Sequence, residues 1–464
     1  MSYLGAAESL VHHGNLRIPV GDWFEADSTA PLHHFPPGFS IAIAVPVAAG
    51  LAPVQGARIV MAAGAGVAVG TAAWLADLAA GWAAAVLVAL LLALLPAIMS
   101  VHVEVLSEPL FLALLAVMLA LMVRPRAADS PRSAGGRAAP SSDPSRLDAL
   151  GYGTSAALGA MVRYAGLSLG GAAMVWAYRE GGSRAERVRR VLVAAAPTAV
   201  LFGAWVIRTT AQQQPIRQVG LFPRWGDNLR QLGATVVDQL APSVESAWLR
   251  AVLAVVAGGL LLALLWDGVC RARADVGGAN ASARGTDADP TRGAEGTKLT
   301  QSSDPAPTAA RGRLYPALGV IGACYVAELV LARLVADPGI PFDGRLLSPL
   351  IFLSVLGAAV AIALGWPRWR PLTRAVAAVA LLAWSSGASS VFVDEYTDLR
   401  AHGTGYARDE WRDSPVTAWL RTEGRRFALF TNHPMIAYLE TGRASRELPD
   451  SLSAEILQDF RDAL

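Results

Sequence analysis

The chain has 464 residues, is 53% hydrophobic and only 16% charged, and carries a formal net charge of +2. Apolar runs of about 20 residues recur along it, which is the length that a helix needs to cross the core of a bilayer. The composition therefore predicts a multi-span helical membrane protein, and the near-zero charge excludes the basic footprint of a nucleic-acid-binding protein.

Residues 1–56 precede the first long apolar run, and we expect them to lie outside the cytoplasm with two juxtamembrane helices. The first helix is SYLGAAESLVHHG, residues 2–14. Its apolar face consists of Tyr3, Leu4, Ala7, Leu10 and Val11. The motif LHHFPPGF, residues 32–39, leads into a second helix over 38–52, which is short and contains Pro46. A helix in the outer interface is predicted there, and a short first span is the alternative.

Ten apolar runs follow, and together they predict a transmembrane domain over residues 57–392. The predicted spans are 57–78, 81–99, 108–123, 149–161, 164–178, 189–207, 248–267, 314–334, 346–365 and 372–392. The short pair 149–178 is predicted to be a hairpin that does not fully cross. Arginine clusters follow alternate spans at 124–146, 184–190, 271–273 and 368–370. Arginine-rich loops stay cytoplasmic, and ten crossings place all four clusters on that side.

Two stretches of this domain are predicted to be disordered cytoplasmic loops, residues 125–147 and 271–312. Both are rich in small and polar residues and have little apolar bulk to bury. Residues 393–464 turn polar again and predict a small extracytoplasmic α/β domain, with RRFALFTN as a strand and PMIAYLETG as a helix. Cys270 and Cys324 belong to different span regions, so no disulfide is predicted.

Charged residues at the outer ends of the spans are the candidate functional residues, because charge at membrane depth is costly. Glu108 begins a span in SVHVEVLSEPLF, residues 100–111. It could cap that helix, or it could bind a divalent cation with His102 and Glu104, although their spacing is not diagnostic of a metal site.

Two arginines are predicted on the same outer face. Arg163 lies at the turn of the short hairpin, and Arg345 precedes a span in PFDGRLLSPL, residues 341–350. A guanidinium binds phosphate through two hydrogen bonds, so the two arginines together suit a lipid phosphate. The alternatives are interfacial snorkelling of Arg163 and a surface ion pair of Arg345 with Asp343.

The N-terminal segment also contains acid–base candidates. They are Asp22, Glu25, Asp27, His33 and His34. A solvated loop is the alternative interpretation of this group.

In this order the motifs resemble integral-membrane glycosyltransferases of the GT-C type, in the branch with protein O-mannosyltransferases and the lipid A aminoarabinose transferase. SYLGAAESLVHHG and LHHFPPGF resemble the two juxtamembrane helices of that family, and VLSEPLF resembles the acidic end of its second outer loop. VRYAG resembles a later basic hairpin, and GRLLSPL a late outer loop. The resemblance runs from Tyr3 to about residue 392. SPVTAWLR and LFTNHPMIAYLETGR resemble the small outer domain of some bacterial members.

The resemblance implies an all-α polytopic GT-C-like fold in the inner (plasma) membrane, with an extracytoplasmic active face. It implies sugar transfer from a polyprenyl-phosphate donor to a glycan, lipid or protein acceptor, with inversion. The residues it implies are Glu108 and Asp27 as catalytic groups, and His33, His34, Arg163, Tyr164 and Arg345 as substrate-binding groups. Membrane lipids are the other expected partners. No cofactor is assigned, and a divalent cation on a loop carboxylate stays open.

The resemblance also implies an acidic residue shortly before Tyr3, with a span ahead of it. The sequence begins at Met1, so we expect both to belong to a segment upstream of it, with Asp22 or Asp27 as a less favoured substitute. The alternatives to an active transferase are a non-catalytic relative that binds polyprenyl lipids and a membrane transporter. The absence of an internal repeat disfavours a transporter.

Overall fold

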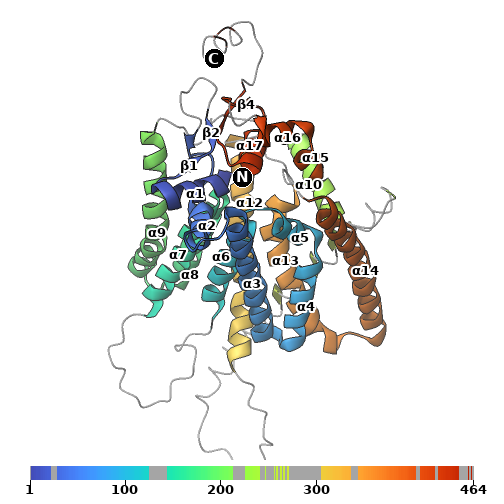
Figure 1. Ribbon diagram of the computed structural model, residues 1–464. Coiled ribbons are helices and arrows are strands. Elements are labelled where there is room, and N and C mark those ends of the chain that lie inside the picture. Colours follow the sequence, from blue (N-terminus) through green and yellow to red (C-terminus); the bar gives the residue numbers. More distant parts are fainter. Residues whose placement is uncertain are drawn as a thin grey trace, which may run out of the picture.

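The computed structural model describes residues 2–21, 29–124, 144–212, 225–240, 305–335, 343–403, 408–423 and 427–448, with scattered positions over 246–270 and at 458 and 461. Membrane-type helices form a bundle, and short helices and strands cover one of its ends (Figure 1). Both the N-terminal helix and the C-terminal strands lie at that covered end. We call it the outer end.

The outer end begins with α1 (Ser2–His13), followed by the strands β1 (Arg17–Ile18), β2 (Val20–Gly21) and β3 (Ala30–Pro31) and by α2 (Gly38–Ala48). The predicted apolar face of α1 is confirmed, because its side chains pack with α2 and α3 in one cluster. With 11 residues, α2 spans only about 17 Å, which is too short to cross a bilayer.

The bundle consists mainly of helices that coincide with predicted spans. They are α3 (Pro53–Ala80), α4 (Trp82–Leu94), α5 (Pro96–Val103), α6 (Glu108–Val123), α7 (Pro144–Val162), α8 (Leu167–Glu180), α9 (Arg184–Ala211), α12 (Pro305–Val335), α13 (Gly344–Gly365) and α14 (Pro371–His402). The sequence did not predict α10 (Trp225–Leu240), which lies at the covered end (Figure 1). The predicted span 81–99 is broken at Leu95, where Pro96 starts α5.

Within the described residues, five helices are long and apolar enough to cross a membrane: α3, α9, α12, α13 with the adjoining η4 (Trp366–Arg368), and α14. The helices α2, α4 and α6 are apolar but shorter. The chain is therefore a helical membrane protein, and the count of ten spans stays a prediction. Residues 248–267 lie largely outside the described part of the chain.

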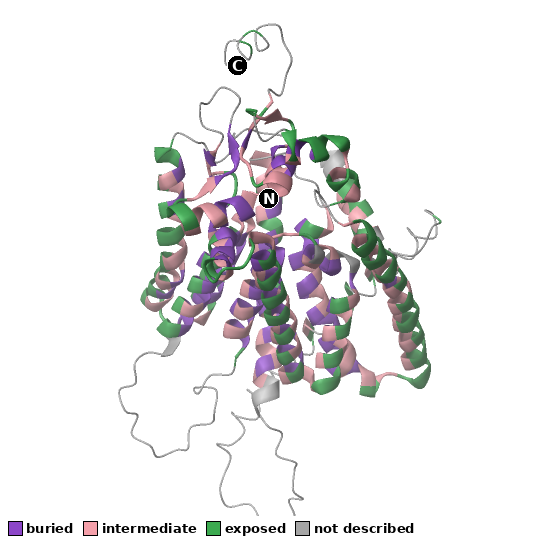
Figure 2. Cartoon of the chain, in the orientation of Figure 1, coloured by how far each residue is buried: buried purple, intermediate pink, exposed green. Residues whose placement is uncertain are grey.

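The core of the bundle lies where α3, α4, α6, α7, α8, α12 and α13 meet. Figure 2 shows the buried residues gathered there, whereas α14 is largely exposed along its length. Small residues allow the close approach: a Cβ on Gly64 of α3 would lie 2.9 Å from backbone atoms of Pro109 and Leu110 in α6. Bulky side chains of α6 then fill the surrounding space.

At the opposite end, arginines join five helices. Arg311 of α12 donates to the carbonyl of Ala79 at the end of α3, with its Nη2 at 3.0 Å. Arg313 pairs with Glu180 of α8 at 2.5 Å and donates to the carbonyl of Arg124. Arg124 follows α6 and pairs with Asp148 of α7. Arg124, Arg311 and Arg313 therefore lie at the same end of the bundle. That this end faces the cytoplasm stays a prediction.

The predicted loop 271–312 is wrong at its end. Residues 305–312 belong to α12, whose first residue is a proline, as is common at the first turn of a helix. Ala310 is buried, and Arg311 is held by its bonds to Ala79. The predicted loop 125–147 ends earlier too, because α7 begins at Pro144. The remainder of both loops lies outside the described residues.

The C-terminal segment joins the N-terminal segment in one small sheet. After α14, which continues to His402, come α15 (Asp409–Arg412), α16 (Pro415–Arg421), β4 (Phe430–Thr431), α17 (Pro434–Thr441) and β5 (Ser445–Glu447). The predicted strand and helix of this segment are present as β4 and α17. The sheet has the order β2-β5-β4 with parallel pairing, and Val20 lies opposite Ser445. The two outer segments therefore form one unit rather than two separate ones.

A partly buried tyrosine also joins these segments. The hydroxyl of Tyr438 in α17 donates to the carboxylate of Glu8 in α1. Burial and this carboxylate both raise the pKa of Tyr438 above its ordinary value. The C-terminal segment is thereby fixed over α1.

We expect Gly64→Ala to destabilise the bundle by about 1–3 kcal/mol, because the added methyl group collides with the backbone of α6. Gly70→Ala on the same helix is the control, since a Cβ there meets nothing within 4 Å. It should be neutral or stabilising by about 0.5–1 kcal/mol. Thermal unfolding in detergent measures both, and equal midpoints would contradict the packing.

We expect the attachment of the C-terminal segment to weaken at high pH. Because the folded-state pKa of Tyr438 is raised, its bond to Glu8 contributes fully below the ordinary tyrosine pKa of about 10 and is lost as the pH rises beyond it. Limited proteolysis between residues 403 and 434 should therefore accelerate above pH 10. Tyr438→Phe should be cleaved faster at neutral pH and lose that pH dependence; a wild-type-like profile in this variant would disprove the role of the bond.

Candidate functional site at the outer ends of the helices

A buried ion pair lies at the centre of the candidate site. Glu108 is the first residue of α6, and Arg163 lies in the turn between α7 and the short helix η2 (Tyr164–Gly166). Arg163 Nη1 contacts Glu108 Oε1. The Glu108 residue is only 4% exposed, and the Arg163 side chain is 21% exposed. The pair joins two segments that are 55 positions apart in sequence.

The protein does not provide a hydrogen-bond partner for every polar atom of this pair. Among the described residues, Oε2 of Glu108 has no hydrogen-bond partner although it is buried. The carboxylate lies in the first turn of α6, where the positive end of the helix dipole favours it, as the helix-end interpretation predicts. It also pairs with Arg163, and one buried acceptor oxygen remains beside a guanidinium with further donors.

Tyr3 of α1 lies against this pair. It shares a hydrogen bond with the buried Ser107, and the charges of Arg163 and Glu108 both act on its hydroxyl. Its ring lies 5.1 Å from the rings of Phe35 and Phe39. Burial raises the pKa of Tyr3, so the hydroxyl is neutral and can donate a hydrogen bond at physiological pH.

Burial by itself would lower the pKa of Arg163, but the nearby Glu108 carboxylate outweighs it and the pKa is raised. Arg163 therefore stays a cation in its partly buried place. A permanent cation and a carboxylate with a spare oxygen are suited to a ligand that has both an anionic group and a hydroxyl.

The HHFPPGF segment is fastened to the turn that carries Arg163. The Tyr164 hydroxyl donates to the carbonyl of His33 at 3.1 Å, and it accepts from Trp205 Nε1 at 3.3 Å. Arg208 donates to the carbonyl of Leu32 at 3.2 Å. A Cβ on Gly38 would lie 2.6 Å from the carbonyl oxygen of Met161, so α2 touches the backbone of α7.

The two predicted histidines meet each other at the edge of this arrangement. Their ring centroids are 3.9 Å apart, and Nδ1 of His33 donates to the carbonyl of Pro31 at 2.9 Å. His34 is exposed. The structure ties the backbone of this segment to Tyr164, while a substrate-binding role of the imidazoles stays a prediction.

Two residues of α12 complete the site, and the sequence analysis missed both. The Tyr325 hydroxyl donates to the carbonyl of Leu346 at 2.7 Å, and Glu328 Oε2 accepts from the backbone N–H of Ser168 at 2.8 Å. The charge of Arg163 acts on both side chains. The available signal was the glutamate inside the apolar run ACYVAELV, residues 323–330, because a carboxylate within a span is rare.

Arg345 lies at the start of α13 and is 43% exposed. Its Nε and Nη2 contact Oδ2 of Asp343 at 2.8 and 2.7 Å. The other oxygen of Asp343 accepts from the N–H of Leu346 and caps α13. The predicted alternative of an Asp–Arg pair is thus present, and the carboxylates of Glu108 and Glu104 also act on Arg345. The structure brings both predicted arginines into the electrostatic range of Glu108.

Other predicted candidates do not join this cluster. Asp22, Glu25 and Asp27 lie outside the described residues. The ring of His102 is bonded to the carbonyl of Ile98, and Glu104 is exposed. No group of three or more metal-type side chains with the geometry to hold an ion is found in the part of the chain that the structure describes. Cys270 and Cys324 are both free.

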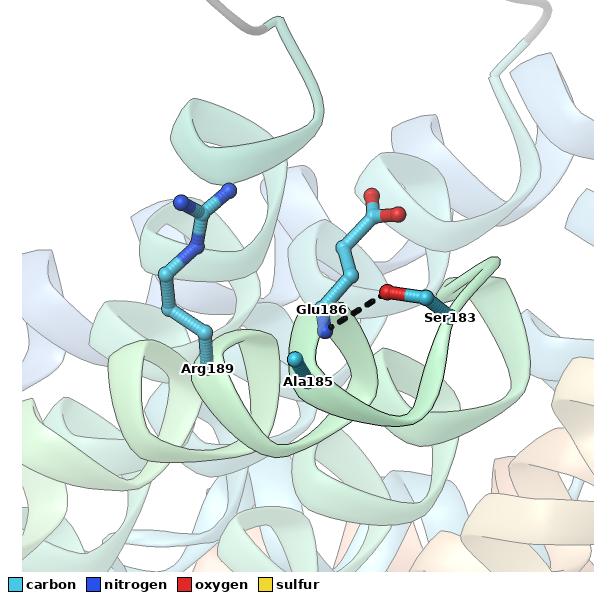
Figure 3. Close-up of a pocket in the computed structure, with 4 residues that line it drawn as sticks. All are labelled: Ser183, Ala185, Glu186 and Arg189. Carbon is cyan, nitrogen blue, oxygen red and sulfur yellow. Dashed lines mark hydrogen bonds between the residues drawn. The ribbon is translucent and has the colours of Figure 1, made fainter.

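Two hollows elsewhere contain none of these residues. One of about 460 Å³ lies at the start of α9, where Ser183 accepts from the N–H of Glu186 and caps the helix (Figure 3). The other, of about 620 Å³, lies mainly between α8 and α12 and includes Arg179 and Cys324. The Glu108 pair is therefore the stronger candidate, because its evidence is an unsatisfied buried group rather than surface shape.

Comparison with protein families found no matching family model, and comparison with curated proteins found no match. Two solved structures are similar in fold: ArnT from Cupriavidus metallidurans bound to undecaprenyl phosphate, with a TM-score of 0.41, and the same protein in the apo state, with 0.40. Each is 13% identical, and each alignment covers 99% of this chain and 82% of the other. At such TM-scores, we base the function on the contacts of this chain alone.

We expect Arg163→Ala to cost about 3–5 kcal/mol of stability, because it leaves the Glu108 carboxylate buried without its cation. Arg345→Ala is the matched control, since the exposed Arg345–Asp343 pair is worth at most about 1 kcal/mol. The double variant Glu108→Gln/Arg163→Ala should recover part of the loss. Thermal unfolding of the four proteins measures this, and equal losses for the two arginines would contradict the buried pair.

Proposed function

We propose that the chain transfers a sugar from a polyprenyl-phosphate donor to an acceptor at the outer end of the bundle. The observation that carries this proposal is the buried Glu108–Arg163 pair with its unsatisfied carboxylate oxygen. Such a pair suits a sugar phosphate, which offers an anionic oxygen to the guanidinium and hydroxyl groups to the carboxylate.

In the proposed reaction, an acceptor hydroxyl or amine attacks the anomeric carbon of the donor sugar. The bond between that carbon and the phosphate oxygen breaks, the acceptor loses its proton to a base, and polyprenyl phosphate leaves with inversion at the sugar. Negative charge develops on the phosphate, so a fixed cation beside it lowers the barrier.

Arg163 is the proposed phosphate ligand, and Arg345 assists it from the start of α13. Arg163 has guanidinium donors beyond the one on Glu108, and its burial strengthens each bond that it makes. Arg345 is more exposed than Arg163, and it already forms an ion pair with Asp343. We therefore assign it the smaller contribution.

Glu108 is proposed to orient a hydroxyl of the sugar or the acceptor through its free oxygen. Asp27 is the proposed base, on the basis of its residue type and its position in the outer N-terminal segment. Tyr164, His33 and His34 are proposed to line the substrate side, because Tyr164 joins the histidine segment to the turn of Arg163.

The arrangement of charge supports the proposed location of the active face. The arginines that join α3, α6, α7, α8 and α12 lie at one end of the bundle, and the Glu108 pair lies at the other. Because arginine-rich ends stay cytoplasmic, we place the site on the extracytoplasmic face of the inner (plasma) membrane. The lipid part of the donor would then lie among the membrane helices.

The test is transfer of labelled sugar from a panel of polyprenyl-phosphate donors to membrane acceptors, by the protein in proteoliposomes. We expect Arg163→Lys, which keeps the charge but not the planar donors, to lower kcat/KM about 10²- to 10³-fold. Glu108→Gln and Asp27→Asn should also lose activity, and Arg345→Ala should lose about tenfold. Arg400→Ala, an exposed arginine on α14, is the control with normal activity.

Binding of undecaprenyl phosphate, measured in parallel, separates the alternatives. A wild-type protein that binds the lipid in an Arg163-dependent way without transferring sugar would be a non-catalytic lipid-binding relative. Full activity in the Arg163 and Glu108 variants would refute the proposed roles of the pair. Uptake of a solute without sugar transfer would point to a transporter.

A further inference from the structure

We propose that Glu328 is a positioning residue: with Tyr325 on the same helix, it sets the places of the two arginine-bearing segments of the site. Its carboxylate ties the start of α8 to α12, and the Tyr325 hydroxyl ties the start of α13 to α12. This inference rests on the proposed function, in which Arg163 and Arg345 bind one phosphate.

The Glu328 contact satisfies a helix end that would otherwise lack a partner. Ser168 is the second residue of α8, and the first N–H groups of a helix have no acceptor within it. Glu328 Oε2 accepts from the Ser168 N–H at 2.8 Å, across 160 positions in sequence. A carboxylate is also favoured there by the positive end of the helix dipole. The bond therefore fixes α8 relative to α12.

Hydrogen bonds within the backbone turn connect Ser168 to Arg163, so fixing Ser168 also restrains Arg163. The Gly166 N–H donates to the carbonyl of Arg163 at 2.8 Å, and the Ser168 hydroxyl donates to the carbonyl of Ala165 at 2.6 Å. A Cβ on Gly166 would lie 2.1 Å from the backbone of Gly159 in α7, so the turn has no room on that side. A shift of Ser168 would consequently move the residues from 163 to 167 together.

Tyr325 makes the corresponding contact toward Arg345. It lies three residues before Glu328, hence on a neighbouring part of the same helix face. Its hydroxyl donates at 2.7 Å to the carbonyl of Leu346, which follows Arg345 directly. Tyr325 is 1% exposed, so this bond is shielded from water. One face of α12 thus contacts both segments that carry the proposed phosphate ligands.

A carboxylate within a membrane-spanning helix is costly even in the last two turns, where Glu328 lies, and this argues against an incidental role. A capping side chain of ordinary polarity would satisfy the Ser168 N–H at lower cost. The charge of Glu328 additionally attracts Arg163. Glu328 therefore both holds the turn through Ser168 and interacts electrostatically with Arg163.

The experiment compares Glu328→Ala, Glu328→Gln and Tyr325→Phe with Glu395→Gln, a carboxylate on α14 that lies outside this network. Amide hydrogen exchange of residues 163–170 in nanodiscs reports the turn, and binding of undecaprenyl phosphate and the donor KM report the arginines. We expect Glu328→Ala to speed exchange in the turn about tenfold and to weaken lipid binding about tenfold, with kcat changed less.

Glu328→Gln keeps an acceptor oxygen for Ser168, so exchange in the turn should stay near the wild-type rate while lipid binding weakens. Tyr325→Phe should weaken lipid binding without faster exchange at residues 163–170. Glu395→Gln should change neither. Unchanged exchange and unchanged binding in Glu328→Ala would overturn the proposal, and so would a lower unfolding temperature with normal lipid binding.

Failure of the proposed function gives a different result. If the wild-type protein neither binds undecaprenyl phosphate nor transfers sugar, the proposed function is wrong. In that case, amide hydrogen exchange in the turn is the only test of the positioning role of Glu328. Faster exchange in Glu328→Ala supports the role, and unchanged exchange refutes it.

Discussion

A glutamate and an arginine that neutralise each other inside the outer end of the bundle constrain most of the structure around them. Glu108 is nearly fully buried, and a buried carboxylate without a cation is strongly destabilising. The start of α6 and the turn between α7 and α8 must therefore stay in contact for the pair to form. The remaining contacts of the site arrange further segments around this fixed point.

The segments around the pair are fastened by backbone as much as by side chains. Tyr164 and Arg208 bind carbonyl groups of the histidine segment, Tyr325 binds a carbonyl next to Arg345, and Glu328 binds the N–H of Ser168. Contacts to backbone groups fix where a segment lies while leaving its side chains available. The arrangement consequently suits a site in which several short loops must keep fixed positions relative to one another to bind a ligand.

The outer segments add a layer over this site. The strand β2 from the N-terminal segment pairs with β5 from the C-terminal segment, and Glu8 accepts from Tyr438. Two parts of the chain that look independent in composition thus fold as one unit, because short strands of two or three residues are stable only when paired. The unit is fixed to α1, the helix that also carries Tyr3.

The sequence by itself determined the membrane helices, the apolar face of α1 and the identity of Glu108, Arg163 and Arg345 as candidates. These features depend on local periodicity, on the length of apolar runs and on the cost of charge near a membrane. Each of them can be recognised from residues that are close together in the sequence. Only the tertiary structure decided that Glu108 pairs with Arg163, that Glu328 holds Ser168 and that β2 joins β5. Each of these contacts joins residues that are 55 to more than 400 positions apart, and their pairing is decided by which helices pack together rather than by any local pattern.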